Sequence, residues 1–421
     1  MTDGEEPPAA AGVRPEVRSW IEANWDPGLS LLEWRTRLAD SGWACPTWPT
    51  EWGGRSLPAS AADVVSEELA RAGAVGVPDG VGMNLAAPTL LEHGSDDLKA
   101  RLLRPTVTGE ITWCQLFSEP GAGSDLAGLT TRAVRDGDQW VVNGQKVWNT
   151  SAHHADYGLL VARTDGDVPK HQGITYFVIP MHQPGIEVRP LRQMNGHASF
   201  NEVFFDDARI PGANQVGELG HGWTVALATL AHERHYAMIR AVAPSASAER
   251  AGRAQREAGA ERAVVYEPYK WYPQRAGRVD LVVERATATG ASTDPVVRQE
   301  IARLLGLARS ASWTAQRARA ARALGRPPGP EGSLGKLAAS QVARAAAAVH
   351  ARIAGASGML TGVDSPVGGV IAEILVSVPA VSIAGGTDEI QRNIVGERVL
   401  GLPREPDPSH QLPFRDVAKN G

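Results

Sequence analysis

The hydrophobic pattern of the chain changes its period twice, and this limits the folds that the sequence can adopt. Residues 15–110 contain segments with helical spacing, such as Ala61–Ala74. Residues 111–217 instead show short β-rich runs separated by turn pairs such as Asp136-Gly137 and Asn143-Gly144. Helical spacing returns in residues 218–405. Since 421 residues suffice for two or three structural units, we expect a helical domain, an antiparallel β domain and a second helical domain in this order.

Individual elements can be placed within these three regions. One predicted helix starts near Gly222, and the end of the chain contains two further clear helices. Residues 1–14 are predicted to be a disordered tail and residues 406–421 a second tail, and residues 251–290 form an insertion in the last domain. The predicted strands are Ala133–Val134, Trp140–Val142, Gly158–Ala162, Ile174–Ile179 and Glu202–Phe205, and the two late helices are Ala347–Ile353 and Glu389–Leu400.

The composition excludes several classes of function. The formal net charge is −5 and the basic residues are scattered, so the sequence does not favour binding to nucleic acid. Two distant cysteines argue against a disulfide framework or a zinc site, and we expect no bound metal. The first residues lack the pattern of a signal peptide, and no apolar run is long enough to span a bilayer. We therefore expect a cytoplasmic enzyme without membrane contacts.

The most specific chemical signal lies in Trp113–Thr150, where a Glu-Pro-Gly-Ala-Gly-Ser-Asp turn is followed by β-type alternation. Gly121 and Gly123 permit backbone angles that a Cβ would forbid and let a ligand approach the main chain. Together with the Ser124 hydroxyl, the free N–H groups of such a turn can form an anion-binding concavity. A tight β-turn without a ligand is the alternative interpretation.

Three phrases of the chain closely resemble the acyl-CoA dehydrogenase family. They are His93–Glu110, Trp113–Thr150 and Gly385–Glu405. The resemblance implies an α+β multi-domain fold, with an N-terminal helical domain, a middle antiparallel β domain and a C-terminal four-helix bundle. It also implies FAD as cofactor, with the turn Ser118–Ser124 holding the flavin and its pyrophosphate. An indole can cover an isoalloxazine face and a hydroxyl can bond its N5 edge, and these roles fall to Trp148 and Thr150.

The same resemblance supplies a set of site residues. Glu389 matches a position that touches the flavin, but it can instead be an acidic residue that stabilises the start of the last helix. Arg298 is the nearest candidate for a cross-subunit arginine whose usual phrase is missing, and Arg234 matches a position that contacts CoA or stabilises its helix. The expected cofactor-binding residues are Gln115, Phe117, Ser118, Gly123, Ser124, Trp148, Thr150, Arg298, Thr387 and Glu389, and the expected substrate-binding residues are Ser124, Arg234 and Gly386.

The catalytic base is predicted at Glu233. Most relatives place it in a late Tyr-Glu-Gly-Thr phrase, but the matching phrase here has Gly385 at the glutamate position. A minority branch, similar to the isovaleryl- and long-chain acyl-CoA dehydrogenases, places the base on the earlier helix, where Glu233 stands. The pattern alone also allows Glu233 to be an ion-pair residue. The resemblance assigns the N–H of Gly385 to the substrate carbonyl.

The resemblance also implies substrates and partners. The substrate would be an acyl-CoA, with the trans-2-enoyl thioester as product and an electron-transfer flavoprotein or similar acceptor. Details of the closing phrase most resemble dehydrogenases of steroid side chains and other bulky acyl groups, some of which are α2β2 heterotetramers. A homodimer or homotetramer is the other arrangement, and a silent partner subunit or a flavin oxidase are the alternative functions.

One aromatic segment has no match in this comparison. Tyr266, Tyr269, Trp271 and Tyr272 fall within seven residues of the predicted insertion. A packed surface loop and a lid or partner-binding element are both compatible with this sequence.

Overall fold

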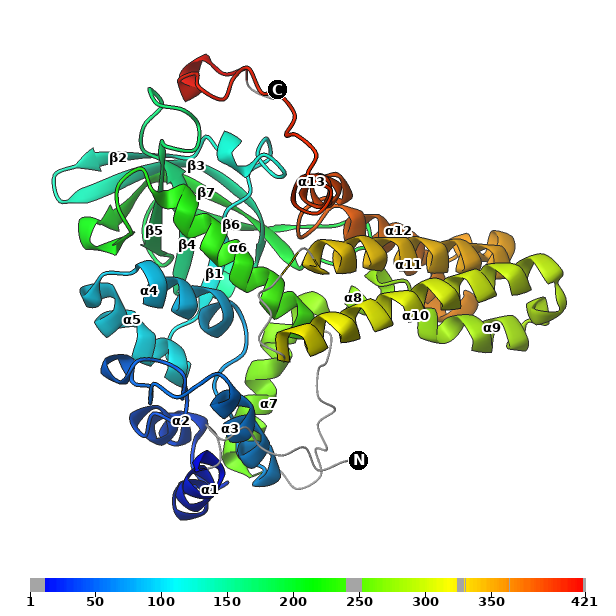
Figure 1. Ribbon diagram of the computed structural model, residues 1–421, viewed down its shortest axis with the longest axis horizontal. Coiled ribbons are helices and arrows are strands. Elements are labelled where there is room, and N and C mark those ends of the chain that lie inside the picture. Colours follow the sequence, from blue (N-terminus) through cyan, green and yellow to red (C-terminus); the bar gives the residue numbers. More distant parts are fainter. Residues whose placement is uncertain (1–11, 240–251, 324–328, 330, 363, 419–421) are drawn as a thin grey trace. The chain divides into compact units, whose positions relative to one another are not determined.

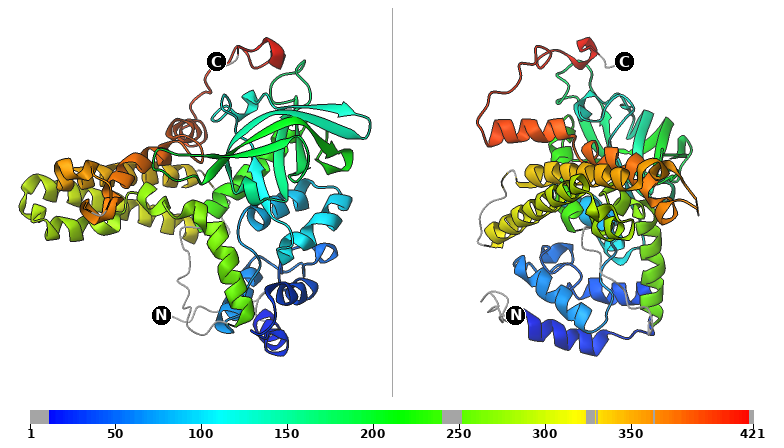
Figure 2. Two further views of the ribbon diagram at one scale, coloured as in Figure 1. Left: turned by 180° about the vertical axis from the view of Figure 1, so that it is seen from behind. Right: turned by 90° about the vertical axis from the view of Figure 1, so that its right-hand side faces the viewer.

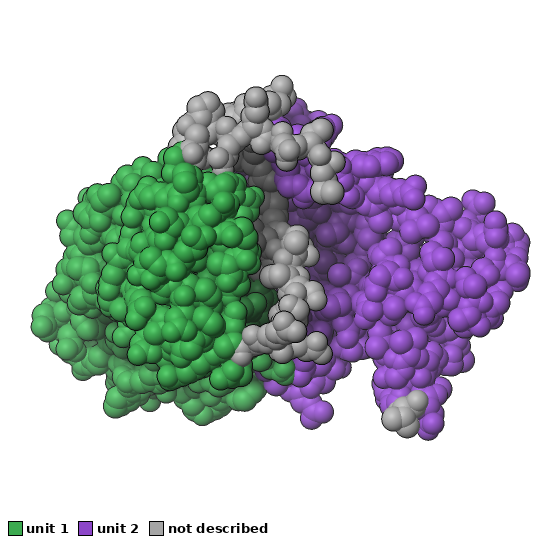
Figure 3. Space-filling view, turned by 90° about the horizontal axis from the view of Figure 1, so that it is seen from below, with its two compact units in different colours: residues 1–191, 199–268, 409–421 green, residues 192–198, 269–408 purple. Residues whose placement is uncertain are grey.

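The computed structural model describes residues 12–239, 252–323, 329, 331–362 and 364–418, with the side chains of residues 234–239, 322, 323 and 331 outside the described part. The chain divides into two compact units, which Figure 3 shows in different colours. Unit 1 comprises residues 1–191, 199–268 and 409–421, and unit 2 comprises residues 192–198 and 269–408. The predicted N-terminal tail lies almost entirely outside the described residues.

Unit 1 begins with helices whose ends are marked by capping side chains. Ser30 and Glu33 form a reciprocal capping box at the start of α2, and the Ser95 hydroxyl caps α5. In α3, Glu68 is buried and accepts bonds from Arg14 and Arg18 of α1 and from Arg71. The helices are α1 (Val13–Asn24), α2 (Leu31–Asp40), α3 (Ser60–Arg71), α4 (Ala87–His93) and α5 (Asp96–Thr108), with a π-helical turn at Gly82–Ala86.

The middle of unit 1 is a β-sheet in the order β6-β7-β3-β2-β4-β5-β8, with β1 paired to β4. All five predicted runs lie in strands, which confirms the alternation argument. The sheet is mostly antiparallel, but β1 pairs with β4 in parallel register and β2 touches β4 in the same sense. The strands are β1 (Trp113–Leu116), β2 (Arg132–Asp136), β3 (Gln139–Thr150), β4 (Tyr157–Arg163), β5 (Ile174–Pro180), β6 (Ile186–Leu191), β7 (Phe200–Pro211) and β8 (Gln215–Val216).

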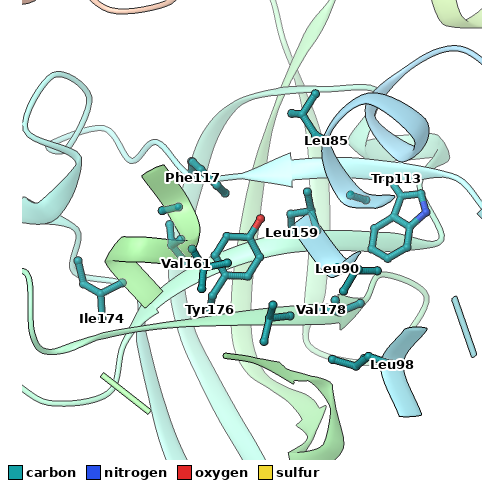
Figure 4. Close-up of a cluster of buried hydrophobic side chains, with 14 of the residues drawn as sticks. Leu85, Leu90, Leu98, Trp113, Phe117, Leu159, Val161, Ile174, Tyr176 and Val178 are labelled. Atoms are coloured by element: carbon teal, nitrogen blue, oxygen red, sulfur yellow. The ribbon is translucent and has the colours of Figure 1, made fainter. Parts of the chain in front are cut away.

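Strands β4 and β5 are buried on both faces, which explains their continuous apolar sequence. Leu159 and Tyr176 face a core that also contains residues of α4, α5 and α6 (Gly222–Ile239), as Figure 4 shows for the labelled side chains. Their neighbours Leu160 and Phe177 face the other side, where they pack with residues of β2, β3 and β7. Figures 1 and 2 show these helices against the sheet. The two cores make this part of unit 1 a rigid support.

Two later segments also belong to unit 1. Helix α7 (Arg253–Tyr266) packs on α2, where Glu261 pairs with the buried Arg35 at 2.6 Å. The Tyr266 hydroxyl donates to Asp79. Near the end of the chain, the N–H of Phe414 donates to the carbonyl of Val168 at 2.9 Å. The segment predicted as a C-terminal tail is therefore bonded to the β domain at this point.

Unit 2 is helical, and α10 and α11 run side by side along much of their length (Figures 1 and 2). Residues 192–198 join this unit because His197 lies 2.9 Å from Glu373 and stacks on Trp271. Trp271 is buried, so this aromatic residue packs a core and is not part of a surface lid. The helices are α8 (Tyr272–Arg275), α9 (Val282–Ala288), α10 (Pro295–Ala323), α11 (Glu331–Ala354), α12 (Val370–Ser377) and α13 (Asp388–Arg398).

Candidate active site

The turn Ser118–Ser124 follows β1 and is closed by a reciprocal pair of backbone hydrogen bonds. The N–H of Glu119 donates to the carbonyl of Ala122 at 3.0 Å, and the reverse bond measures 3.1 Å. Gly123 and Ser124 are exposed, and a Cβ at Gly123 would meet no atom within 4 Å. Gly123 does not have a left-handed φ, so this glycine is not required for a left-handed backbone, and the space at its Cβ position is open.

The end of β3 presents two further predicted residues. Trp148 has a left-handed φ of 65°, and its side chain remains 56% exposed although it touches Phe200 edge-on. A register shift between β3 and β7 spans Lys146 to Asn149, so the backbone bulges outward at the indole. Thr150 is half-buried, and within the described part of the chain no group hydrogen-bonds to its hydroxyl. An exposed indole beside a free hydroxyl suits a planar polar ligand.

Strand β3 is bonded both to β1 and to the turn. The N–H of Val147 donates to the carbonyl of Ser118 at 2.9 Å, and Asn149 Nδ2 donates to the carbonyl of Gln115 at 2.7 Å. The structure therefore brings the predicted residues of β1, the turn and β3 together in unit 1. Phe117 is an exception in one respect, because its side chain packs in the core against Tyr176. Its side chain is therefore part of the core, which does not support direct contact with a ligand.

Glu233 is carried by a helix that hydroxyl groups lock to its neighbours. Thr229 Oγ1 lies 3.0 Å from the Tyr176 hydroxyl of β5 and 2.9 Å from Thr89 Oγ1 of α4. All three residues are buried. Because Glu233 stands four residues after Thr229, it projects from the same face of α6. Glu233 therefore lies on the face of α6 that packs against β5 and α4.

The carboxylate of Glu233 meets another predicted residue. Gln115 Nε2 of β1 donates to Glu233 Oε2 at 3.1 Å, and Glu233 is half-buried. This contact joins the candidate base to the strand that leads into the turn. The preceding His232 is half-buried with Nε2 3.2 Å from Glu92 of α4, as a packed histidine would be. The side chain of Arg234 lies outside the described residues.

Unit 2 holds Gly385, Gly386 and Thr387 in a turn before α13, with Glu389 in the first turn of that helix. Gly385 and Gly386 both have left-handed φ, 68° and 82° respectively. Gln391 Nε2 donates to the carbonyl of Gly385 at 3.2 Å. The Thr387 hydroxyl accepts from the N–H of Ile390, so it caps the helix, and Glu389 is exposed and pairs with Arg392. The sequence Thr387-Asp388-Glu389 therefore does begin α13, with two acidic residues in its first turn.

Sequence reasoning missed the residue that fixes this turn. Asp388 is buried, and its Oδ1 accepts from Lys336 Nζ at 2.8 Å and from Ser340 Oγ at 2.7 Å, both on α11. Burial raises the pKa of Asp388, but the bonds from Lys336 and Ser340 outweigh it and hold the pKa below its usual range. Arg298, in contrast, is exposed at the start of α10 and bonds only to the loop before it among the described residues.

Comparisons with known proteins agree with this geometry. Models of the N-terminal, middle and C-terminal domains of acyl-CoA dehydrogenases match residues 9–110, 114–208 and 247–400. The acyl-CoA dehydrogenase IpdE1 of Mycobacterium tuberculosis is 37% identical over 417 residues, covering 93% of this chain and 97% of that protein. The chain belongs to the acyl-CoA dehydrogenase family. This acyl-CoA dehydrogenase is an oxidoreductase that acts on CH–CH groups, and the aromatic segment lies within the C-terminal match.

Solved structures of relatives include paired chains. The ChsE4–ChsE5 complex of M. tuberculosis matches with a TM-score of 0.63 and 28% identity, covering 96% of this chain and all of that one. A protein described as the Tcur3481–Tcur3483 steroid ACAD matches with a TM-score of 0.62 and 26% identity, covering 96% and 100%. Across the described residues of our chain, no helix has the length and apolarity needed to cross a membrane.

Proposed function

We propose that this acyl-CoA dehydrogenase uses FAD to convert a branched or bulky acyl-CoA to its trans-2-enoyl thioester, with Glu233 as the base. The observation that carries the proposal is the placement of Glu233, half-buried on α6 and bonded to Gln115. Gln115 lies in β1, the strand that leads to the turn Ser118–Ser124. A carboxylate beside the expected flavin turn is what removal of an α-proton requires.

The residues present fit FAD in chemical terms. The exposed Trp148 indole, the free Thr150 hydroxyl and the open space at Gly123 supply an aromatic face, a hydrogen-bond donor and an approach to the main chain. When bound, FAD supplies the acceptor for the hydride that leaves Cβ. The proposed cofactor contacts in unit 1 also include Gln115 of β1 and three residues of the turn, Ser118, Gly123 and Ser124. The proposed contacts from unit 2 are Thr387, Glu389 and Arg298.

Glu233 would act on the substrate by taking a proton from Cα. Its position near the end of a helix packed on the sheet limits its access to water, and a bound acyl chain would limit it further. Desolvation raises the pKa of a carboxyl group and makes its anion a stronger base. The N–H of Gly385 is the proposed donor to the thioester oxygen, where it would stabilise negative charge as the proton leaves. Arg234 and Gly386 are the proposed contacts to CoA.

The acyl group is proposed to be branched or bulky near the thioester. Gly385 has no side chain at the position where most relatives carry a glutamate, and a Cβ there would meet no atom within 4 Å. With the base on α6 instead of at position 385, the carboxylate would also approach the substrate's Cα from a different direction. A solved relative described as a steroid ACAD supports the same substrate class.

Partners follow from the same reasoning. The two electrons that a hydride brings to the cofactor must pass to an acceptor before the next turnover, so we propose an electron-transfer flavoprotein or similar acceptor. A second chain is proposed as well, either another copy or a divergent subunit in an α2β2 heterotetramer. The relative solved as the ChsE4–ChsE5 complex supports the second arrangement.

The decisive experiment mixes the purified, FAD-loaded chain anaerobically with straight, branched and polycyclic acyl-CoAs and follows flavin bleaching. We expect bleaching, with the highest kcat/KM in the branched or polycyclic set. A preference for unbranched butyryl-CoA would contradict the substrate class but leave the reaction intact. No bleaching by any thioester would identify a silent partner subunit. Oxygen consumption in place of reduction of an artificial acceptor would identify a flavin oxidase.

A further inference from the structure

Lys146 of β3 is a residue that the proposed function leaves unexplained. Its side chain has no exposed surface, although an ammonium group is rarely buried without partners. Nζ donates to the carbonyl of Phe117 and to Oε1 of Glu119, both at 2.9 Å. Both acceptors belong to the end of β1 and the turn that follows it. A buried positive charge therefore joins β3 to the expected flavin turn.

Glu119 completes this contact from the side of the turn. Its side chain is only 5% exposed, and its carboxylate also accepts from the N–H groups of Thr130 and Thr131 and from the Thr130 hydroxyl, at 2.7–2.8 Å. Burial alone would raise the pKa of Glu119, but the Lys146 charge and these donors outweigh it and lower the pKa to about 2. The Glu119 carboxylate is therefore charged, and it has four hydrogen-bond donors.

The pair stands next to a backbone position that needs outside support. Trp148 follows Lys146 by two residues and has a left-handed φ, which a residue with a bulky side chain rarely adopts. Such conformations persist only where the surrounding structure holds them. Lys146 is fixed on one side by Glu119, and Asn149 is fixed on the other side by the carbonyl of Gln115. The bulge that exposes the indole lies between these two anchors.

We propose that the Glu119–Lys146 ion pair is a positioning device for the cofactor. It fixes the turn Ser118–Ser124 against β3 and holds Trp148 in the conformation that exposes its indole. Neither Glu119 nor Lys146 would touch the cofactor, so both are positioning residues. The inference rests on the proposed function, because it takes this surface to be the flavin site.

A pair that served stability alone would behave differently from a positioning pair. Breaking it would make the chain easier to unfold, but the folded fraction would bind FAD in an unchanged environment. A positioning pair also controls the distance between the indole and the bound flavin. Flavin emission reports on that distance, since a stacked indole quenches it. The two roles can therefore be separated by spectroscopy without any assay of turnover.

The test uses Lys146→Met, Glu119→Gln and the double variant, with Trp148→Phe as the reference for a lost indole. Mutation of residues that support the direct ligands of other sites typically weakens binding 10–100-fold, so we expect each single variant to raise the Kd for FAD on the order of 10–100-fold. Emission of the bound flavin should rise toward that of Trp148→Phe. The double variant should resemble the singles, because both residues act through one contact. Glu261→Gln is the matched control, since it breaks the Arg35–Glu261 pair on α2 and α7.

Each outcome decides between the two roles. If the folded single variants bind FAD as the wild type does, with unchanged emission, the positioning role is wrong. If the single variants do not fold, the double variant, in which neither residue of the pair is charged, gives the answer by the same two measurements. Failure of the wild-type chain to bind FAD would contradict the proposed function itself, and this shows in the titration before any variant is made.

Discussion

Each of the two units contains a turn that the sequence predicts to take part in the site, and the two turns differ in their structure. Each is held by a buried carboxylate with a lysine partner, Glu119 with Lys146 in unit 1 and Asp388 with Lys336 in unit 2. The unit 1 turn lies beside Trp148 and leads from the strand that carries Gln115. The unit 2 turn contains two glycines with left-handed φ, Gly385 and Gly386.

In our proposal the acid–base chemistry lies in unit 1. Glu233 needs only an ordinary helical backbone, whereas position 385 has a left-handed φ that favours glycine. A chain with its base on a helix can leave the turn to supply a backbone N–H. Four predictions test the contrast, from the largest expected effect to the smallest.

The largest effect is expected from Glu233→Gln, which keeps the shape of the side chain and removes its charge. Flavin reduction by substrate should slow by about 10²–10⁴-fold, the usual contribution of a general base, while FAD stays bound. Stopped-flow absorbance measures the rate. Glu92→Gln on α4 is the matched control, because its exposed carboxylate lies near the preceding His232 and should change the rate by about twofold at most. Equal losses in both variants would remove Glu233 from the role of base.

Asp388→Asn tests the anchor of the unit 2 turn. It leaves Lys336 without its buried partner, and such losses typically cost about 3–5 kcal/mol of unfolding free energy. Urea unfolding measures the change. The neighbouring Glu389→Gln should cost less than about 0.5 kcal/mol, because that side chain is exposed. A larger loss for Glu389 than for Asp388 would reverse the assignment of the structural residue in this turn.

The unit 1 anchor makes stability depend on pH. The folded-state pKa of Glu119 is lowered to about 2, below the usual value of about 4.3. The contribution is therefore complete above about pH 4.3 and is lost as the pH falls toward 2, with a size of about 3 kcal/mol. Unfolding of the wild type and Glu119→Gln between pH 6 and 3 isolates it, and the variant should show the weaker dependence. Parallel curves would mean that Glu119 titrates normally.

The smallest effect is expected from an alanine in each turn. Gly385→Ala places a Cβ at a left-handed φ and should cost about 1 kcal/mol, although no atom lies within 4 Å of that Cβ. Gly123→Ala should change stability by less than about 0.5 kcal/mol, because its φ is not left-handed and the space is equally open. Thermal unfolding compares them. Equal costs would show that the turns do not differ in backbone strain.

Much of the fold could be predicted because local patterns determine it. Alternation located β2 to β5 and β7. The parallel pairing of β1 with β4 could not be predicted, since it joins segments far apart in the chain. Residue preferences do not specify which distant strand becomes the neighbour.

The site was predictable in its residue types but not in its contacts. Gln115 and Glu233 are 118 residues apart, and only the packing of α6 on the sheet brings them together. One signal for the ion pair was present in the sequence. Lys146 lies in the same alternation phase as the buried Trp140 and Val142, so a lysine there predicts a buried partner. The sequence does not show that the partner is Glu119.

The most direct test of the central claim is exchange of the substrate's α-proton with solvent. An acyl-CoA with sulfur in place of Cβ can lose a proton from Cα but cannot donate hydride, so exchange reports the base alone. In D₂O, mass spectrometry should show deuterium entering Cα with the FAD-loaded wild type and with Glu92→Gln. With Glu233→Gln, the rate should fall by about 10²–10⁴-fold. Exchange at the wild-type rate in Glu233→Gln would contradict the assignment of Glu233 as the base.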